Sequence, residues 1–399
     1  MTKHSIDSHS PNEIYIVEAL RTAIGGTNKA LKDFSAVQLG GFVIKEILRQ
    51  SSVPGDLVNQ VILGNTVSAG LGQNPARHAA ILGNLPDSVP ALTINHVCGS
   101  GLQAVILAGQ AIICQESDLV MAGGFESASR SPKILKKDAS EKREDSDFSD
   151  SLIHDGLWCH ITGKHMGELA EYLAEKNHIS REEQDKYAYQ SHLKACEAQE
   201  LNQLAKEIVT VRINEDQIFT KDERPRRNIS LERLSQLPAA FKDGGTVTAG
   251  NSCIPSDGAA VFLLASAQAV KKFKLKPKAR VIAHASIAVE PKLTFTGSII
   301  STEECLKKAK LKISDVDLFE ISEAFAVQAI VTQQALKIPE EKMNIFGGDV
   351  ALGHPLGAAG ARILVTLVHA LENQKKKTGL ATVCLGGGGS VAVVIENLS

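Results

Sequence analysis

The chain has 399 residues, and its 43 lysines and arginines against 45 aspartates and glutamates give a formal net charge of -2. Hydrophobic residues make up 43 % and charged residues 22 %, a globular composition that excludes a disordered or collagen-like chain. The near-neutral charge argues against nucleic acid as a partner. This length predicts roughly two to three domains.

The lack of a recognisable secretory signal and the cysteine content predict a reducing compartment. No apolar run approaches the roughly 18 residues of a membrane helix. The opening residues, MTKHSIDSHS, lack the apolar segment of a secretory signal. The seven cysteines are an odd number without a CxxC pair, which argues against a zinc site or a thioredoxin-like motif. We therefore expect a cytoplasmic protein with free thiols, no membrane partner and no metal.

The first 124 residues predict alternating strands and helices. Strands are expected at 14–17, 60–63, 91–94 and 119–122, the last stopping at Gly123 and Gly124, and helices at 35–49, 75–82 and 101–114. Short apolar strands that alternate with helices predict an α/β fold with a parallel sheet covered on both faces.

The pattern changes between about residues 125 and 253. The run 133–150 is dense in mixed charge and is interpreted as a solvated surface loop, and amphipathic helices are expected at 166–177 and 180–200. The alternation then returns. Strands are expected at 261–264, 279–285 and 318–321, helices at 301–309, 324–336 and 358–371, and a final hairpin at 382–385 and 391–395.

An internal similarity suggests two related halves. The sequence LVMAGG at 119–124 resembles TVCLGG at 382–387, and each follows a predicted helix. We therefore divide the chain into the first part of an amino-terminal α/β half (11–124), an inserted loop domain with the return to that half (125–255), the end of that half (256–275), and a carboxy-terminal α/β half (276–399).

Two blocks carry a candidate nucleophile and a candidate base. Cys98, in NHVCGSG, is expected at a strand-to-helix turn, where the helix dipole stabilises a thiolate; a buried structural cysteine is the alternative. His354, in GHPLGAAG, is expected at a helix entry, where it can act as a base. A capping turn with a satisfied histidine is its alternative, and the nearby Gly357 and Gly360 would allow close helix packing.

Two further blocks complete the candidate site. Cys384, in CLGGGGS, is expected to end a strand, and the glycines after it free backbone N–H groups for an oxyanion hole; a flexible hairpin turn is the alternative. Ser322, in SEAF, lies between a strand and a helix and is alternatively a helix cap. Reactive groups gather beyond the carboxyl ends of parallel strands. We therefore expect one thiolate as nucleophile, His354 as its base and the second thiol as a proton shuttle.

These four blocks, in this order and spacing, resemble the signature blocks of the thiolase family over almost the whole chain. The resemblance implies a layered fold of two similar α/β halves with an inserted loop domain, assembled as a homodimer or homotetramer. It implies coenzyme A thioesters as substrates and no other cofactor. Cys98 would take an acyl group from acyl-CoA, His354 would activate Cys98, and Cys384 would remove a proton from a second acetyl-CoA. The N–H groups of Cys98 and Gly386 would hold the oxyanion.

The resemblance also assigns a substrate-binding surface in the loop domain. The residues aligned with positions for CoA or the acyl pocket are Leu157, His165, Met166, Arg226, Phe241, Ala249, Ser252, Cys253 and Phe325. The pair of His165 and Met166 is similar to short-chain, acetoacetyl-type thiolases. Arg226 belongs to the basic run RPRR at 224–227, whose alternative interpretation is a solvated loop.

Several residues depart from the family pattern. Ser322 stands where an asparagine usually helps His354 to position a water, Cys253 replaces a serine, and Asp349 replaces a small residue before GHP. The segment TFTGS at 294–298 also differs. We expect that Ser322→Asn keeps or raises turnover.

Three functions follow from the resemblance. The favoured one is a fatty-acid-metabolism enzyme that condenses two acetyl-CoA into acetoacetyl-CoA, or the reverse. A degradative 3-oxoacyl-CoA thiolase for longer chains is the second. An acyl-CoA-binding protein with impaired catalysis is the third, motivated by Ser322.

Overall fold

The fold is built on one large mixed sheet. The computed structural model describes residues 13–135 and 147–399. Most of the predicted charged loop and the polar amino-terminal tail lie outside these ranges. The sheet has eleven strands in the order β15-β16-β17-β14-β1-β13-β5-β3-β4, with β10 paired to β1 and β2 to β13. Its strands are β1 (Ile14–Thr22), β2 (Gly25–Gly26), β3 (Gln60–Gly64), β4 (Ala91–Ile94), β5 (Leu119–Ser127), β10 (Ile208–Val209), β13 (Ser256–Ser266), β14 (Ala279–Ala288), β15 (Leu318–Ile321), β16 (Thr378–Leu385) and β17 (Gly389–Asn397).

The predicted α/β class is confirmed, but the prediction of a parallel sheet is wrong for most strand pairs. β3 runs parallel to β4 and β5, and β15 runs parallel to β16. β13 pairs antiparallel with β1 and β5, and β17 pairs antiparallel with β14 and β16. A direct hairpin such as β16–β17 makes its strands antiparallel, whereas parallel pairing requires a crossover connection. The sheet therefore combines parallel pairs joined by crossovers with antiparallel pairs, of which β16–β17 is a direct hairpin.

All the predicted helices are present. The helices are α1 (Ala36–Ser51), α2 (Pro75–Leu82), α3 (Ser100–Ile113), α4 (Met166–Asn177), α5 (Arg181–Glu200), α6 (Leu231–Ser235), α7 (Ala267–Phe273), α8 (Gly297–Ala309), α9 (Ala326–Leu336), α10 (Asp349–Leu352) and α11 (Leu356–Gln374). α1 and α5 begin with capping boxes: the side chains of Ser35 and Ser180 accept from the third helical N–H, and Gln38 and Glu183 accept in return.

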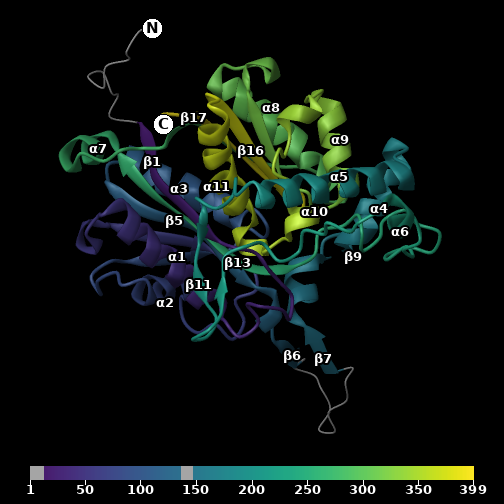
Figure 1. The fold of residues 1–399 in the computed structure, drawn as a ribbon, viewed down its shortest axis with the longest axis horizontal. Helices are drawn as coiled ribbons and strands as arrows, with labels where there is room; N and C mark the ends of the chain where they lie inside the picture. Colours follow the sequence, from purple (N-terminus) through teal and green to yellow (C-terminus); the bar gives the residue numbers. More distant parts are fainter. Residues whose placement is uncertain (1–12, 136–146) are drawn as a thin grey trace.

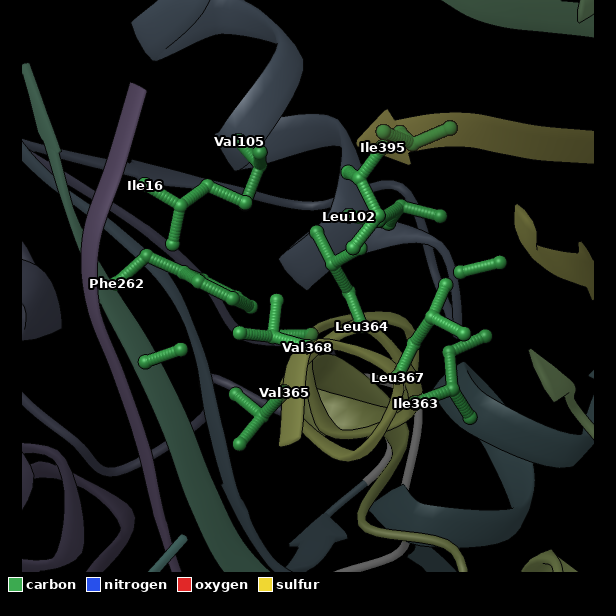
Figure 2. Close-up of a cluster of buried hydrophobic side chains, with 14 of the residues drawn as sticks. Ile16, Leu102, Val105, Phe262, Ile363, Leu364, Val365, Leu367, Val368 and Ile395 are labelled. Atoms are coloured by element: carbon green, nitrogen blue, oxygen red, sulfur yellow. The ribbon is translucent and has the colours of Figure 1, made fainter. Parts of the chain in front are cut away.

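The centre of the molecule is the pair of helices α3 and α11. Every residue from Leu356 to Leu371 of α11 is buried, as expected for a helix that is covered on all sides. Figure 2 shows α11 surrounded by Ile16, Leu102 and Ile395, which come from three other elements. Gly360 confirms the predicted close packing, because a Cβ atom there would lie 2.8 Å from the Leu102 Cβ atom.

The strand predicted at 119–122 does not stop at Gly123. β5 continues to Ser127, so this part of the prediction is wrong. The two glycines instead allow close approach of other backbone segments. A Cβ atom on Gly123 would lie 2.1 Å from the Ala260 carbonyl oxygen, and one on Gly124 would lie 2.0 Å from the Gly357 carbonyl oxygen. The glycines thus bring the start of α11 against the sheet.

The segment between β5 and β13 contains α4, α5, α6 and three short hairpins. The hairpins pair β6 (Lys133–Leu135) with β7 (Phe148–Asp150), β8 (Trp158–Cys159) with β9 (Lys164–His165), and β11 (Val211–Arg212) with β12 (Ile218–Phe219). In Figure 1, α4, α6 and β9 lie to one side of the large sheet, near α9 and α10. Within the described ranges, no helix has both the length and the apolar character needed to cross a membrane.

Candidate active site

Cys98 lies in a constrained turn between β4 and α3, as predicted. The preceding Val97 has a φ of +48°, a left-handed conformation that costs a β-branched residue about 1–3 kcal/mol. Hydrogen bonds hold it there: the Val97 carbonyl oxygen accepts from Ser100 Oγ at 2.6 Å and from Thr66 Oγ1 at 3.1 Å. The Val97 N–H donates to Asn95 Oδ1 at 2.9 Å. The turn therefore fixes Cys98 at the amino-terminal end of α3.

His354 lies in the short connection between α10 and α11. Its backbone N–H donates to the Ile254 carbonyl oxygen at 3.0 Å. Gly353, with a φ of +101°, makes the turn possible, because a Cβ atom there would lie 2.3 Å from Ser256 Oγ. Further along α11, the Gly360 N–H donates to the Cys98 carbonyl oxygen at 3.3 Å. This bond joins the His354 block to the Cys98 turn.

Cys384 lies near the end of β16, and its side chain is buried. The next residue, Leu385, packs against the Cys98 turn so closely that a Cβ atom on Gly99 would lie 2.5 Å from Leu385 Cδ2. Gly386 follows directly, and a Cβ atom there would lie 3.7 Å from Met166 Sδ. The carboxyl end of β16 therefore meets the Cys98 turn and α4.

One cavity of about 110 Å³ brings these segments together. It is lined by Cys98, Gly156, Leu157, His165, Met166, Phe241, Ser252, Cys253, Pro255, Phe295, Ala324, Phe325, His354, Cys384, Leu385 and Gly386. The two predicted reactive thiols and the predicted base, which are far apart in the sequence, thus share one small space.

Aromatic rings form one wall of this cavity. The His165 ring stacks on Phe241 with ring centroids 5.0 Å apart, and Phe325 meets Phe241 and Phe295 edge to face. His165 also caps α4, where its Nδ1 atom accepts from the Gly167 N–H at 3.0 Å. Gly167 is required, because a Cβ atom there would lie 2.2 Å from the Phe241 ring. The wall is therefore rigid and apolar.

Burial and neighbouring charges shift the pKa values of two groups in the cavity, Cys384 and His354. It raises the pKa of Cys384 to about 12, and the nearby Cys98 charge adds to this effect, so this thiol stays protonated at neutral pH. Burial would lower the pKa of His354, but a Cys98 thiolate and the Asp349 carboxylate outweigh it and raise the pKa to about 10. At neutral pH these shifts favour a protonated His354 beside a neutral Cys384 thiol.

A second cavity, of about 490 Å³, contains the other two predicted binding residues. It is lined by His192, Arg224, Arg226, Asn228, Ile229, Arg233, Leu234, Leu237, Ala249, Gly250 and Val350. The buried Nε atom of Arg224 has no hydrogen-bond partner among the described residues, which leaves it available to an anion. Arg227 instead pairs with Glu200 at 3.4 Å, so only part of the predicted basic run faces this cavity.

Ser322 lies outside both cavities, and several important residues were not predicted. The Ser322 side chain is fully buried and donates to Asp349 Oδ2 at 2.6 Å. The cavity-lining residues absent from the sequence-based set are Gly156, Pro255, Phe295, Ala324 and Leu385. Phe295, Ala324 and Leu385 lie inside the quoted segments TFTGS, SEAF and CLGGGGS but have no reactive group that would single them out, and Gly156 and Pro255 lie outside the quoted segments. Asp349 was noted only as an unusual residue, although it contacts His354 directly.

Two cysteines and a histidine around one cavity are the groups with which a thiol can carry an acyl group. Sequence profiles described as "Thiolase, N-terminal domain" and "Thiolase, C-terminal domain" match residues 14–268 and 275–397. The chain belongs to the thiolase family.

Similar proteins agree with this assignment. A "Probable acetyl-CoA acyltransferase" of Staphylococcus aureus strain MRSA252 is 44 % identical over 388 residues, 96 % of this chain and 98 % of that protein. The crystal structure of the Bacillus anthracis acetyl-CoA acetyltransferase has a TM-score of 0.93 at 37 % identity, covering 97 % of this chain and 99 % of that one. Human mitochondrial 3-ketoacyl-CoA thiolase has a TM-score of 0.94 at 37 % identity, covering 98 % and 100 % of the two chains, and has also been solved with CoA.

We expect iodoacetamide to modify Cys98 before the other cysteines. Burial raises the pKa of Cys384, Cys253 and Cys305, which keeps these thiols protonated and slow to react. Acetyl-CoA should protect Cys98. Peptide mass spectrometry after short exposures measures the order of labelling, with the Cys98→Ala variant as the control. Preferential labelling of Cys114 or Cys196 would contradict the assignment.

Proposed function

We propose that the protein catalyses the reversible condensation of two acetyl-CoA molecules to acetoacetyl-CoA and CoA. The observation that carries this proposal is the shared cavity of Cys98, His354 and Cys384. The aromatic rings and the Met166 side chain that line it favour a short acyl group over a long one.

In the first half of the proposed reaction, the Cys98 thiolate attacks the carbonyl carbon of acetyl-CoA. The bond from this carbon to the CoA sulfur breaks, and the acetyl group remains on Cys98. The leaving CoA thiolate takes a proton from Cys384, whose thiol is protonated before the reaction because it is buried. Covalent transfer to sulfur thus divides a difficult condensation into two steps, and it leaves Cys384 as a thiolate.

In the second half, the Cys384 thiolate removes a proton from the methyl group of a second acetyl-CoA. This proton is very weakly acidic, so the enolate oxygen needs a hydrogen-bond donor, and the Nε2 atom of His354 is available for it. The carbanion attacks the acetyl group on Cys98. The backbone N–H groups of Cys98 and Gly386 would hold the resulting oxyanion until the Cys98 thiolate leaves.

We propose that CoA occupies the second cavity and reaches the first with its thiol end. Arg224 and Arg226 line the larger cavity and suit phosphate groups. Ala249 lies in the larger cavity, whereas Ser252 and Cys253, only three and four positions later, line the smaller one. The segment 249–253 therefore connects the two cavities along the chain.

Steady-state thiolysis across acyl lengths tests the acetoacetyl-CoA assignment. We expect kcat/KM for acetoacetyl-CoA to exceed that for a C8 3-oxoacyl-CoA by at least about tenfold, since an apolar pocket walled by aromatic rings discriminates by chain volume. Met166→Ala, which enlarges the cavity beside Gly386, should reduce this ratio. Preference of the unmodified protein for C8 or longer chains would instead support a degradative 3-oxoacyl-CoA thiolase. The likeness to human 3-ketoacyl-CoA thiolase favours this second candidate. Thiolysis no faster than that of Cys98→Ala would indicate binding without efficient catalysis.

A further inference from the structure

Asp349 is a fully buried carboxylate that contacts three functional side chains. Its Oδ2 atom accepts from Ser322 Oγ at 2.6 Å and lies 3.0 Å from His354 Nδ1. Its Oδ1 atom pairs with the Nη2 atom of Arg362. The side chains of Asp349 and Arg362 have no exposed surface, and that of His354 is 4 % exposed. A charge removed this completely from water is retained only with good partners, and each of these contacts supplies one.

The contact between Ser322 and Asp349 explains two unusual residues together. In the sequence they stand 27 positions apart and look like independent departures from the family pattern. In the structure the Ser322 hydroxyl donates a hydrogen bond to the Asp349 carboxylate, so the two unusual residues are direct partners. An amide at 322 would be larger, and a small residue at 349 would leave Arg362 without this partner.

We propose that Asp349 is a positioning residue that orients His354 toward Cys98, in an arrangement of Cys98, His354 and Asp349 held in place by Ser322 and Arg362. The inference deepens the proposed function, since it rests on Cys98 as the nucleophile. A carboxylate at Nδ1 fixes the proton on that nitrogen and turns Nε2 toward the cavity. Nε2 has no hydrogen-bond partner among the described residues. A charged Cys98 near the ring raises the pKa of His354.

The surrounding charges support this arrangement. Burial would raise the pKa of Asp349, but the charges of Arg362 and His354 lower it, so the carboxylate stays ionised. Arg362 also faces Glu320 at 3.6 Å. Burial raises the pKa of Glu320 to about 8 despite this contact, so Glu320 is mostly protonated at neutral pH. Arg362 therefore forms its ion pair mainly with Asp349. The other titratable groups that interact with Asp349, His354 or Arg362 are Arg21, Glu323 and the thiols of Cys98, Cys253 and Cys384.

The arrangement also assigns a different task to Ser322. A hydroxyl has one proton, and here that proton is donated to Asp349. Ser322 therefore cannot donate a hydrogen bond to an enolate oxygen or to a water beside it. The enolate then depends on the Nε2–H group of a charged His354, which is a stronger donor than a neutral group.

The inference is tested by alkylation of Cys98 with iodoacetamide as a function of pH, without substrate. Asp349→Asn keeps the size of the side chain and removes its charge. We expect the pH midpoint of alkylation to rise by at least about one unit and the rate at pH 7 to fall by about tenfold, because His354 loses the carboxylate that stabilises its cation and Cys98 then lacks a positive charge beside it. We further expect kcat for thiolysis to fall by about 10- to 100-fold with little change in KM.

Asp257→Asn is the matched control, because Asp257 is equally buried and its carboxylate accepts hydrogen bonds from Ser127 and Ser129 rather than from a residue of this cluster. It should leave the alkylation profile unchanged. An Asp349→Asn variant with the unmodified midpoint and kcat would overturn the inference. If circular dichroism shows that this variant does not fold, the Ser322→Ala variant provides the test. The inference then requires that Ser322→Ala raises the pH midpoint of Cys98 alkylation. Alkylation needs no acyl-CoA, so its outcome is separate from any failure of the proposed reaction.

The structure also changes the expectation for Ser322→Asn. The larger amide must fit beside a charged carboxylate in a site without exposed surface, so we now expect this single change to lower turnover. Turnover of Ser322→Asn equal to or above that of the unmodified protein would contradict this expectation.

Discussion

Replacing Cys98 with alanine is expected to abolish acyl transfer, with a loss of at least about 10³-fold in kcat for acetoacetyl-CoA thiolysis. The proposed reaction passes through a covalent bond to this sulfur, and none of the other groups lining the cavity is in a position to replace it. The thiols of Cys253 and Cys384 also line the cavity, but burial raises the pKa of both and keeps them protonated. A coupled assay that follows the disappearance of acetoacetyl-CoA measures the effect.

Cys114→Ala is the matched control for this variant. Cys114 caps the carboxyl end of α3, the helix that begins beside Cys98, and its side chain is exposed. Its replacement should change neither kcat nor stability by a measurable amount. If Cys98→Ala retained more than about a tenth of the activity, the nucleophile would have to be another residue.

Replacing Cys384 with alanine is expected to separate the two halves of the reaction. Condensation and thiolysis should fall by about 10³-fold, because the group that exchanges protons with CoA and with the second acetyl-CoA is missing. Transfer of an acetyl group from acetyl-CoA to Cys98 should persist at a slower rate, since the nucleophile and His354 remain. Rapid-quench measurements of acetylated protein and of acetoacetyl-CoA distinguish the two halves.

Cys305→Ala is the corresponding control for a buried thiol. Cys305 lies on α8, has no exposed surface, and donates to the Ala392 carbonyl oxygen of β17. Its removal should cost some stability but leave both half-reactions intact. Equal loss of both half-reactions in Cys384→Ala would instead assign Cys384 a role in building the cavity rather than in moving protons.

The places of Cys98 and Cys384 in the fold could be predicted because each lies beside a regular element that its own residues specify. Cys98 comes after a short apolar strand and before a helix of small and apolar residues, and Cys384 ends a strand of buried residues. The relative direction of the strands in the sheet could not be predicted in the same way. Whether β13 runs parallel or antiparallel to β5 depends on how the long intervening segment returns, and no local residue pattern records that path.

Three other features depended on contacts that only the folded chain reveals. Gly123 and Gly124 looked like the end of a strand, but they are needed where other backbone segments approach. Nothing in the sequence predicts a left-handed backbone at Val97, because β-branched residues rarely adopt it. Hydrogen bonds from Ser100 and Thr66 fix this conformation in the folded chain. Asp349 could be noted as unusual, but its pairing with Ser322, His354 and Arg362 joins segments of β15, α10 and α11 through space.

The most direct test of the account is to incubate the unmodified protein with acetyl-CoA, quench it with acid and identify the modified peptide by mass spectrometry. The account predicts a single acetyl group in thioester linkage on Cys98, which disappears when CoA is added and is absent from Cys98→Ala. An acetyl group carried by another residue, or no covalent adduct in a protein that turns over acetoacetyl-CoA, would contradict it.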